Sequence, residues 1–348
     1  MRDVRFPVLA ITVLVSLAAG GARAAAPYPR SGLVTGLTWD TATYRSGGRG
    51  GDIWPVTWGQ DGRVYTAWGD GAVVCPAYVS YGTAAIAGGP SATLATLGCG
   101  PLGPRHGKLR SLLEVAGTLY AVANLQDRPT FPDVAVWASP DHGAAWLTPA
   151  WTFTGAGGSP QPVGFVNFGP GYAGARDGFV YLTAVRPVAK PLRVFLLRAP
   201  AGKPQDQASY EYLTGTDATG APTWGTDPAA AHAVFRDPGG VYGPRIVYDA
   251  ALGRYLLTAA HGDGSGGRIG LFEGPAPWGP WRTVDYEDAW LGMAGGENLG
   301  IGLPTAWMSA DGRTLWAVFS CYGLPGCGVY HDRFNLMRAT LTLAPARR

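Results

Sequence analysis

The sequence lacks several features that would assign it to common functional classes. Charged residues make up only 15% of its 348 residues, and no long stretch repeats hydrophobic residues at a helical period. It contains no G-x-S-x-G turn and no Gly-Lys-Ser/Thr phosphate-binding loop, which disfavours serine esterases and nucleotide-binding enzymes. Beyond the N-terminus no apolar run approaches the roughly 20 residues of a membrane-spanning helix, so no membrane span is expected.

Cysteines are also few, but their number is even. In an exported protein an even count indicates disulfides, and the four are Cys75, Cys99, Cys321 and Cys327. Proximity favours the pairs Cys75–Cys99 and Cys321–Cys327, although four cysteines allow three pairings. A zinc site would need closely spaced C-x-x-C pairs or histidines at fixed spacing, and neither is present. We therefore expect disulfides, no metal and no cofactor.

The N-terminus has the pattern of a secretory signal peptide. Arg2 and Arg5 precede a short apolar run, Val8–Leu17, and the small-x-small segment Ala22-Arg23-Ala24 matches a cleavage site. Residues 1–24 are thus predicted to be removed. The mature protein is predicted to be secreted, to the extracellular space or the periplasm.

The mature chain is close to neutral. Without residues 1–24 the sequence has 24 basic and 23 acidic residues, a net charge near +1. This balance gives no reason to expect nucleic acid or an anionic membrane as a partner. Gly (53), Pro (29) and Trp (13) are abundant, so the chain makes many turns and has aromatic side chains for packing or for stacking on sugar rings.

A Gly-led turn followed by an alternating strand recurs along the chain. The copies begin at Gly62, Gly117, Gly178, Gly253 and Gly312. Each follows another apolar segment that reads as a strand: Pro55–Trp58, Ser111–Val115, Val163–Phe168, Ile246–Tyr248 and Thr305–Met308. Hairpins repeated about every 60 residues are typical of radial repetition. Five copies predict an all-β fold, a five-bladed β-propeller.

Both ends of the chain read as strands, namely Leu33–Leu37 and Met337–Leu343. Their pairing would close the ring and leave only short, protected edges. No linker-like stretch interrupts the repeats, so residues 25–348 are predicted to form a single domain, which we expect to be a monomer. A β-sandwich is the alternative, but it would not explain the recurrence.

The segment Ser139–Trp146 matches the Ser-x-Asp-x-Gly-x-x-Trp pattern called the Asp-box in sialidase-like propellers. Its role is architectural, because the Asp side chain bonds the turn backbone and the Trp packs beneath it. Asp141 is therefore not a catalytic candidate. A sialidase is not indicated either, since no arginine triad can be read from the spacing.

The first hairpin supplies the main catalytic candidates. Asp61-Gly62 lies between two runs rich in β-branched and aromatic residues, a strong hairpin signal. If Asp61 is the pivot, Asp52 faces Asp70 across the two strands; a bulge would slip this register by one residue. Two adjacent carboxylates suit acid/base chemistry with separated pKa values. Alternatively, both bond turn backbone beside their glycines.

Further residues are candidates for binding a sugar in the funnel of the ring. They are aromatic or polar side chains that are also explained by packing or turn formation: Trp54, Trp58, Asp40, His261, Trp278 and Glu297. Glu297 is expected in a Gly-rich loop before the last blade, where it could act as a remote general acid. Trp278 belongs to Pro277-Trp-Gly-Pro-Trp281, whose tryptophans are the best candidates for exposure.

The segment Gly51–Gly71 resembles the opening of the proteins called domain of unknown function 4185. Arg254–Thr258, Pro277–Trp281 and Trp307–Gly312 are similar to later parts of the same pattern, although Ile53 stands where a polar Asn is expected. That family includes bacterial endo-D-arabinanases of glycoside hydrolase family 183. The resemblance implies that Asp52 and Asp70 are catalytic and that the partner is a polysaccharide of the arabinan type.

We therefore expect a secreted hydrolase of a furanoside glycan. Two alternatives stay open: a non-catalytic carbohydrate-binding propeller, and an adhesion or scaffold module that uses its rim for protein contacts. The polymer, the anomeric outcome and the choice of acid and base do not follow from the sequence.

Overall fold

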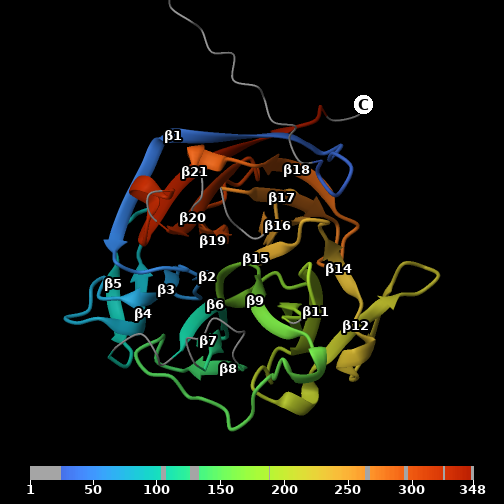
Figure 1. Ribbon diagram of the computed structural model, residues 1–348, viewed down its shortest axis with the longest axis horizontal. Coiled ribbons are helices and arrows are strands. Elements are labelled where there is room, and N and C mark those ends of the chain that lie inside the picture. Colours follow the sequence, from blue (N-terminus) through green and yellow to red (C-terminus); the bar gives the residue numbers. More distant parts are fainter. Residues whose placement is uncertain are drawn as a thin grey trace, which may run out of the picture.

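The computed structural model describes residues 25–102, 107–125, 133–187, 189–262, 267–293, 297–323 and 326–345, and the expected signal peptide lies outside them. In this part of the chain the strands are arranged as blades around a central axis, with the first strand of each blade at the centre (Figure 1). The predicted all-β, five-bladed β-propeller is confirmed.

The first two blades form separate sheets. Blade 1 contains β2 (Val56–Trp58), β3 (Val64–Gly71), β4 (Val79–Ile86) and β5 (Ala95–Cys99). Blade 2 contains β6 (Lys108–Val115), β7 (Thr118–Asn124) and β8 (Val134–Ser139). Isolated bridges, Val134 to Phe153 and Ala138 to Leu147, extend blade 2 beyond β8.

Blades 3 and 4 share one hydrogen-bonded sheet because their inner strands, β9 and β15, pair in parallel. Blade 3 contains β9 (Gln161–Asn167), β10 (Phe179–Val185), β11 (Arg193–Pro200), β12 (Glu211–Thr216), β13 (Pro222–Gly225) and β14 (Ala233–Arg236). Blade 4 contains β15 (Val241–Asp249), β16 (Arg254–His261), β17 (Ile269–Gly274) and β18 (Arg282–Glu287).

Blade 5 is built from both ends of the chain. It contains β19 (Glu297–Gly302), β20 (Thr314–Tyr322) and β21 (Arg333–Leu343), and β1 (Val34–Arg49) is its outermost strand. β1 pairs antiparallel with β21, for example Val34 with Leu343 and Leu37 with Leu341. The predicted closure by the two terminal segments is confirmed.

Helices are short among the described residues and consist of single 3-10 turns. They are η1 (Ala156–Gly158), η2 (Pro170–Tyr172), η3 (Gln207–Ser209), η4 (Pro228–Ala230), η5 (Trp290–Gly292), η6 (Thr305–Trp307) and η7 (Gly328–Tyr330). None of these helices is long and apolar enough to span a membrane.

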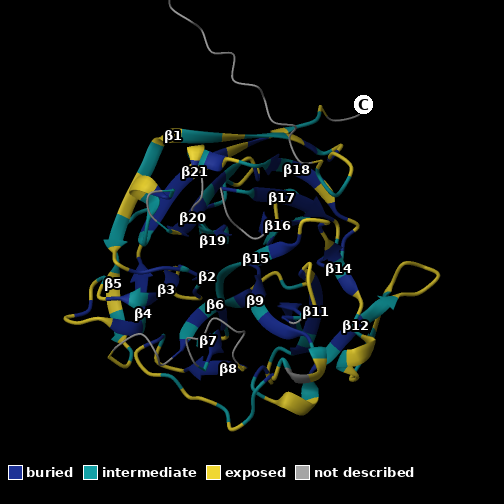
Figure 2. Ribbon diagram, in the orientation of Figure 1, coloured by how far each residue is buried: buried dark blue, intermediate teal, exposed yellow. Residues whose placement is uncertain are grey.

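The core lies between the blades. Strands buried on both faces have continuous apolar and small residues, as in β8, whereas the outermost strands β1 and β5 alternate between partly and fully exposed positions (Figure 2). Trp54, Trp68 and Phe334 pack together between blades 1 and 5, with ring centroids 5.2–5.8 Å apart. Burial of such rings is the main stabilising contribution to a fold of this kind.

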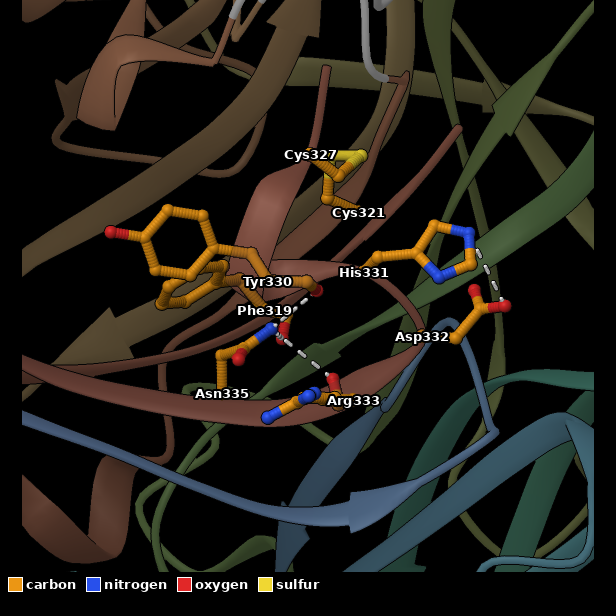
Figure 3. Close-up of a disulfide and its surroundings, with 8 residues drawn as sticks. All are labelled: Phe319, Cys321, Cys327, Tyr330, His331, Asp332, Arg333 and Asn335. Carbon is orange, nitrogen blue, oxygen red and sulfur yellow. Dashed lines mark hydrogen bonds and ion pairs between the residues drawn. A yellow bond between two sulfur atoms is a disulfide. The ribbon is translucent and has the colours of Figure 1, made fainter. Parts of the chain in front are cut away.

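Both expected disulfides are present. Cys75 pairs with Cys99 and Cys321 with Cys327, at Cα separations of 6.0 and 5.7 Å. Figure 3 shows the second, which joins the end of β20 to the turn before η7. The Asp-box is architectural as expected, since Asp141 Oδ1 accepts hydrogen bonds from Ser139 Oγ and the Ala145 amide.

One predicted strand is wrong. Thr305–Met308 does not form a strand, because residues 305–307 close a 3-10 turn in which the Trp307 amide bonds the Pro304 carbonyl. Pro304 has no amide hydrogen to contribute to a strand ladder. The inner strand of blade 5 is β19, in the segment that was expected to be a loop.

Candidate active site

The first hairpin has the predicted register at its turn and departs from it at its open end. Val56 pairs with Thr66, Thr57 with Tyr65 and Trp58 with Val64. Asp52, however, bridges to Gly69 and not to Asp70. The cause is the backbone of Ile53 and Trp54, whose φ angles of +73° and +48° take both residues out of the extended conformation. The direct pairing of Asp52 with Asp70 is therefore corrected by one residue.

Lys108 nevertheless brings the two carboxylates together. Its Nζ lies 3.1 Å from Asp52 Oδ2 and closer still to Asp70 Oδ2. The three side chains are 11–19% exposed. Lys108 is the first residue of β6, so it comes from the neighbouring blade. Sequence reasoning missed it, because nothing in the local pattern of blade 2 indicates a contact with blade 1.

Asp52 is the strongly perturbed acid of this group. Burial, together with the negative charges of Asp70 and Asp332, raises the pKa of Asp52 to about 7, although Lys108 acts in the opposite direction. Its Oδ1 is buried and has no hydrogen-bond partner among the described residues. An acid whose pKa is raised from its usual range toward neutrality can keep its proton for transfer, which suits a general acid.

Asp332 lies on the blade 5 side of the same group. Its backbone carbonyl accepts hydrogen bonds from the amides of Gly50 and Gly51, directly before Asp52. Its carboxylate points toward His331, with Oδ2 3.6 Å from Nε2 (Figure 3). Burial raises the pKa of Asp332, and the charges of His331 and Lys108 oppose this. A third acid is therefore near the pair, and the sequence analysis did not single it out.

A cavity of about 110 Å³ opens beside Asp52. Its polar lining consists of Asp52, Lys108, Arg110, Tyr242 and Arg245, and its apolar lining includes Val163, Val185, Leu192 and Val241. These residues come from blades 1 to 4. They lie shortly before β2, near the starts of β6, β9 and β15, at the end of β10 and directly before β11. The starts of the inner strands therefore share one face of the ring, and the cavity lies at that face.

Arg245 fixes the segment that carries Asp52. Its guanidinium donates hydrogen bonds to the carbonyl oxygens of Ile53 (2.7 Å) and Trp54 (3.1 Å), the two residues in the left-handed conformation. Burial lowers the pKa of Arg245 to about 10, so it stays charged at neutral pH. The side chain acts through the backbone and positions Asp52.

Glu297 is close to this cavity, but its expected setting is corrected. It is the first residue of β19 and not part of a loop. Its carboxylate lies close to the hydroxyl of Tyr242, whose pKa burial and this negative charge raise to about 12 against the opposing charge of Arg110. The structure thus brings Glu297 to the same face of the ring as Asp52.

Two predicted binding residues are buried by packing. Trp54 is fully buried, and its Nε1 bonds the Gly51 carbonyl, so it cannot stack on a sugar. His261 is 6% exposed, stacks on Tyr286 at 4.0 Å and contacts the Glu287 carbonyl through Nε2. Burial lowers its pKa. Both expectations are corrected: Trp54 packs between blades 1 and 5, and His261 packs within blade 4.

The remaining predicted binding residues lie away from the cavity. Trp58 is at the far end of β2 and lines a different pocket beside Asp249 and Thr305. Trp278 follows β17 at that opposite face, where it packs on Tyr181 and Trp224. Asp40 is on the outermost strand β1, paired with Arg338. None of the three belongs to the site around Asp52, because position along a strand, not residue type, decides which face a side chain reaches.

The described part of the chain contains no candidate metal site. Across the ranges that the structure describes, no three His, Cys, Asp or Glu side chains are arranged to hold a metal ion.

Comparison with known proteins identifies the fold and not the family. No family model matches the sequence, and no curated protein matches it. The GH43_1 enzyme from Xanthomonas citri is similar in structure, with a TM-score of 0.53 and 15% identity over 87% of this chain and 94% of that one. Its complex with xylose gives a TM-score of 0.52 at 14% identity, with the same coverage. RS223-β-xylosidase is similar with a TM-score of 0.51 and 12% sequence identity, and the match covers 88% of this chain and 98% of that one.

Proposed function

We propose that this protein is an exported glycoside hydrolase that cleaves a furanoside glycan. The observation that carries the proposal is the group Asp52–Lys108–Asp70, in which a buried carboxyl with a pKa of about 7 shares one ammonium with a second carboxylate. Glycosidic hydrolysis needs a carboxylic acid and a carboxylate at one site, with their protonation states separated by the environment.

We assign the two roles from the pKa of Asp52 and the contacts of Lys108. Asp52, protonated in a large fraction of molecules at neutral pH, donates its proton to the glycosidic oxygen as the bond to the anomeric carbon breaks. Asp70 forms the closer ion pair with Lys108 and acts as the carboxylate on the anomeric carbon. The Oδ2 atoms of Asp52 and Asp70 both contact Lys108 Nζ, so they lie within about 6 Å of each other. The two carboxyl groups are ~5–5.5 Å apart in retaining enzymes and ~6.5–9.5 Å apart in inverting ones. The short separation therefore favours a retaining reaction.

In a retaining reaction, Asp70 bonds to the anomeric carbon while the leaving-group oxygen takes the proton of Asp52. Water then attacks the same carbon, Asp52 takes a proton from that water, and the bond to Asp70 breaks. Lys108 keeps the two carboxyl groups in place and offsets their repulsion through both steps.

Three further observations support the proposal. The similar structures include a β-xylosidase and a GH43_1 enzyme with bound xylose. The Gly51–Gly71 segment resembles a family with endo-D-arabinanases, which makes D-arabinan the first polymer to test. The two disulfides agree with export, since they persist in oxidising compartments.

The test is cleavage of a panel of plant and mycobacterial arabinans and other glycans by the mature protein. Asp52→Asn and Asp70→Asn should each lose at least ~10²-fold in rate. Asp133→Asn, which removes an exposed carboxylate elsewhere, should keep full activity. Cleavage that persists undiminished in both variants would remove this pair from the mechanism. Glycan binding without any cleavage would assign the protein to the carbohydrate-binding propellers.

A further inference from the structure

Arg110 has a setting that catalysis by Asp52 and Asp70 does not explain. It lines the cavity beside Asp52 and lies between Leu109 and Ser111, where the β6–β7 register shifts. A shift of this kind is a bulge, and bulges next to active sites redirect a side chain. The bulge makes room for a guanidinium at the cavity.

Among the described residues Arg110 forms no ion pair, and its Nε is buried without a hydrogen-bond partner. Lys108 contacts two carboxylates and Arg245 bonds backbone carbonyls, so each has a partner. Glu297 lies beside the Tyr242 hydroxyl, and the charges of Glu297 and Arg110 act on the pKa of that hydroxyl in opposite directions. The Arg110 side chain is half-buried, and leaving its buried Nε without a partner is costly. An anion in the cavity would satisfy this donor.

The walls and the size of the cavity indicate what kind of anion fits. The surrounding Val163, Val185 and Leu192 are apolar and lower the local dielectric, which strengthens attraction between a guanidinium and an anion. A cavity volume of about 110 Å³ leaves room for a carboxylate or phosphate group together with several waters.

We propose that Arg110 and the cavity around it form an anion subsite that binds a carboxylate or phosphate substituent of the glycan. The sugar chain lies beside the pair Asp52 and Asp70, and its acidic substituent enters the cavity that Asp52 lines. The identification of the ligand as a glycan rests on the proposed function; the anion subsite rests on the geometry of Arg110.

Binding of monosaccharides tests the subsite without any cleavage. Glucuronate, glucose and inorganic phosphate are titrated into the mature protein by calorimetry at low ionic strength, where screening is weak. The wild type should bind glucuronate, phosphate or both, and should prefer glucuronate to glucose if the substituent is a carboxylate. Binding of phosphate alone assigns a phosphate substituent. If neither anion binds better than glucose, the proposal is overturned.

Variants locate the binding. Arg110→Gln should weaken anion binding about ten- to a hundredfold, the usual effect of losing a hydrogen bond to a charged group. Arg110→Lys keeps the charge but not the forked geometry, so its affinity for the anion should lie between those of the wild type and Arg110→Gln. Arg282→Gln removes the same charge from an exposed position on β18 and should match the wild type. Equal affinity in Arg110→Gln and wild type would contradict the assignment, with near-UV circular dichroism checking the fold.

The outcome is separate from that of the hydrolase proposal. If the protein shows no preference for anions while Asp52→Asn abolishes cleavage, the hydrolase proposal is supported and the anion subsite is contradicted. If the preference for anions depends on Arg110 and no glycan in the panel is cleaved, the anion subsite is supported and the protein is a binding protein.

Discussion

Replacing Asp52 by asparagine should change how the stability of the protein depends on pH. Asn is similar in shape to the protonated carboxyl and does not titrate. In the wild type the carboxyl is held in a buried group with a pKa of about 7. The free energy of unfolding of the wild type, relative to that of Asp52→Asn, therefore reports the protonation of Asp52 together with its effect on the charged neighbours Lys108, Asp70 and Asp332.

The sign and size follow from linkage. The folded protein holds the Asp52 proton more tightly than the unfolded chain, so the contribution to stability is full below about pH 4, declines as pH rises and is lost above about pH 7. The difference between about 7 and the usual 3.8 corresponds to up to roughly 4 kcal/mol, since a tenfold change in an equilibrium constant is about 1.4 kcal/mol. The wild type should thus lose up to this amount relative to Asp52→Asn between pH 4 and pH 8.

Urea unfolding followed by tryptophan fluorescence at unit steps of pH measures the difference. The chain has 13 tryptophans, so the signal is strong. Asp133→Asn serves as the control, because that side chain is exposed and its replacement should leave the pH dependence of the wild type unchanged. A wild-type-minus-Asp52→Asn difference that stays constant from pH 4 to pH 8 would refute the reasoning. The assignment of Asp52 as the acid would fall with it.

Three further predictions test the site and its support. If Asp52 is the acid, kcat/KM on a cleaved glycan should fall about tenfold per pH step above about pH 7, as measured by release of reducing ends; a rate that still rises at pH 9 would exclude this role. Arg245→Gln should cost about 2–4 kcal/mol in urea unfolding and lower kcat, because the Ile53 and Trp54 carbonyls lose charged donors, and an unchanged midpoint would contradict this. Gly71→Ala should destabilise by at least ~3 kcal/mol in the same assay, since a Cβ at that position would lie 1.2 Å from the Gly50 carbonyl oxygen; a midpoint like that of the wild type would show that the backbone can move apart.

The repeats, the closure and the turn register could be predicted because they depend on local patterns. Asp-Gly at a hairpin fixes which residues of β2 and β3 face each other, and the Gly-led turns mark the second strand of each blade. The open end of the hairpin could not be predicted. The left-handed conformations of Ile53 and Trp54 are held by Arg245, about 190 residues further along the chain.

The inner strand of blade 5 shows why composition can mislead. Gly295 and Gly296 make the segment around Glu297 resemble a loop, yet Glu297 begins β19, and Gly300 and Gly302 also lie in this strand. A Cβ at Gly300 would lie 3.2 Å from Arg245 Nε, and one at Gly302 2.9 Å from its Nη1. These glycines leave room for the guanidinium. Lys108 and Arg110 were missed for a related reason: their roles come from the neighbouring blade, and no local spacing encodes that contact.

The pairing of β1 with β21 makes folding depend on the order in which the chain is synthesised. The first strand to be made is the last to find its partner, because β21 lies almost 300 residues further along the chain. Until then 16 residues of β1 present an unpaired edge that other chains can join. Such distant pairing is also slow to form, so the final step of maturation is a ring closure that depends on nearly the whole polypeptide being available.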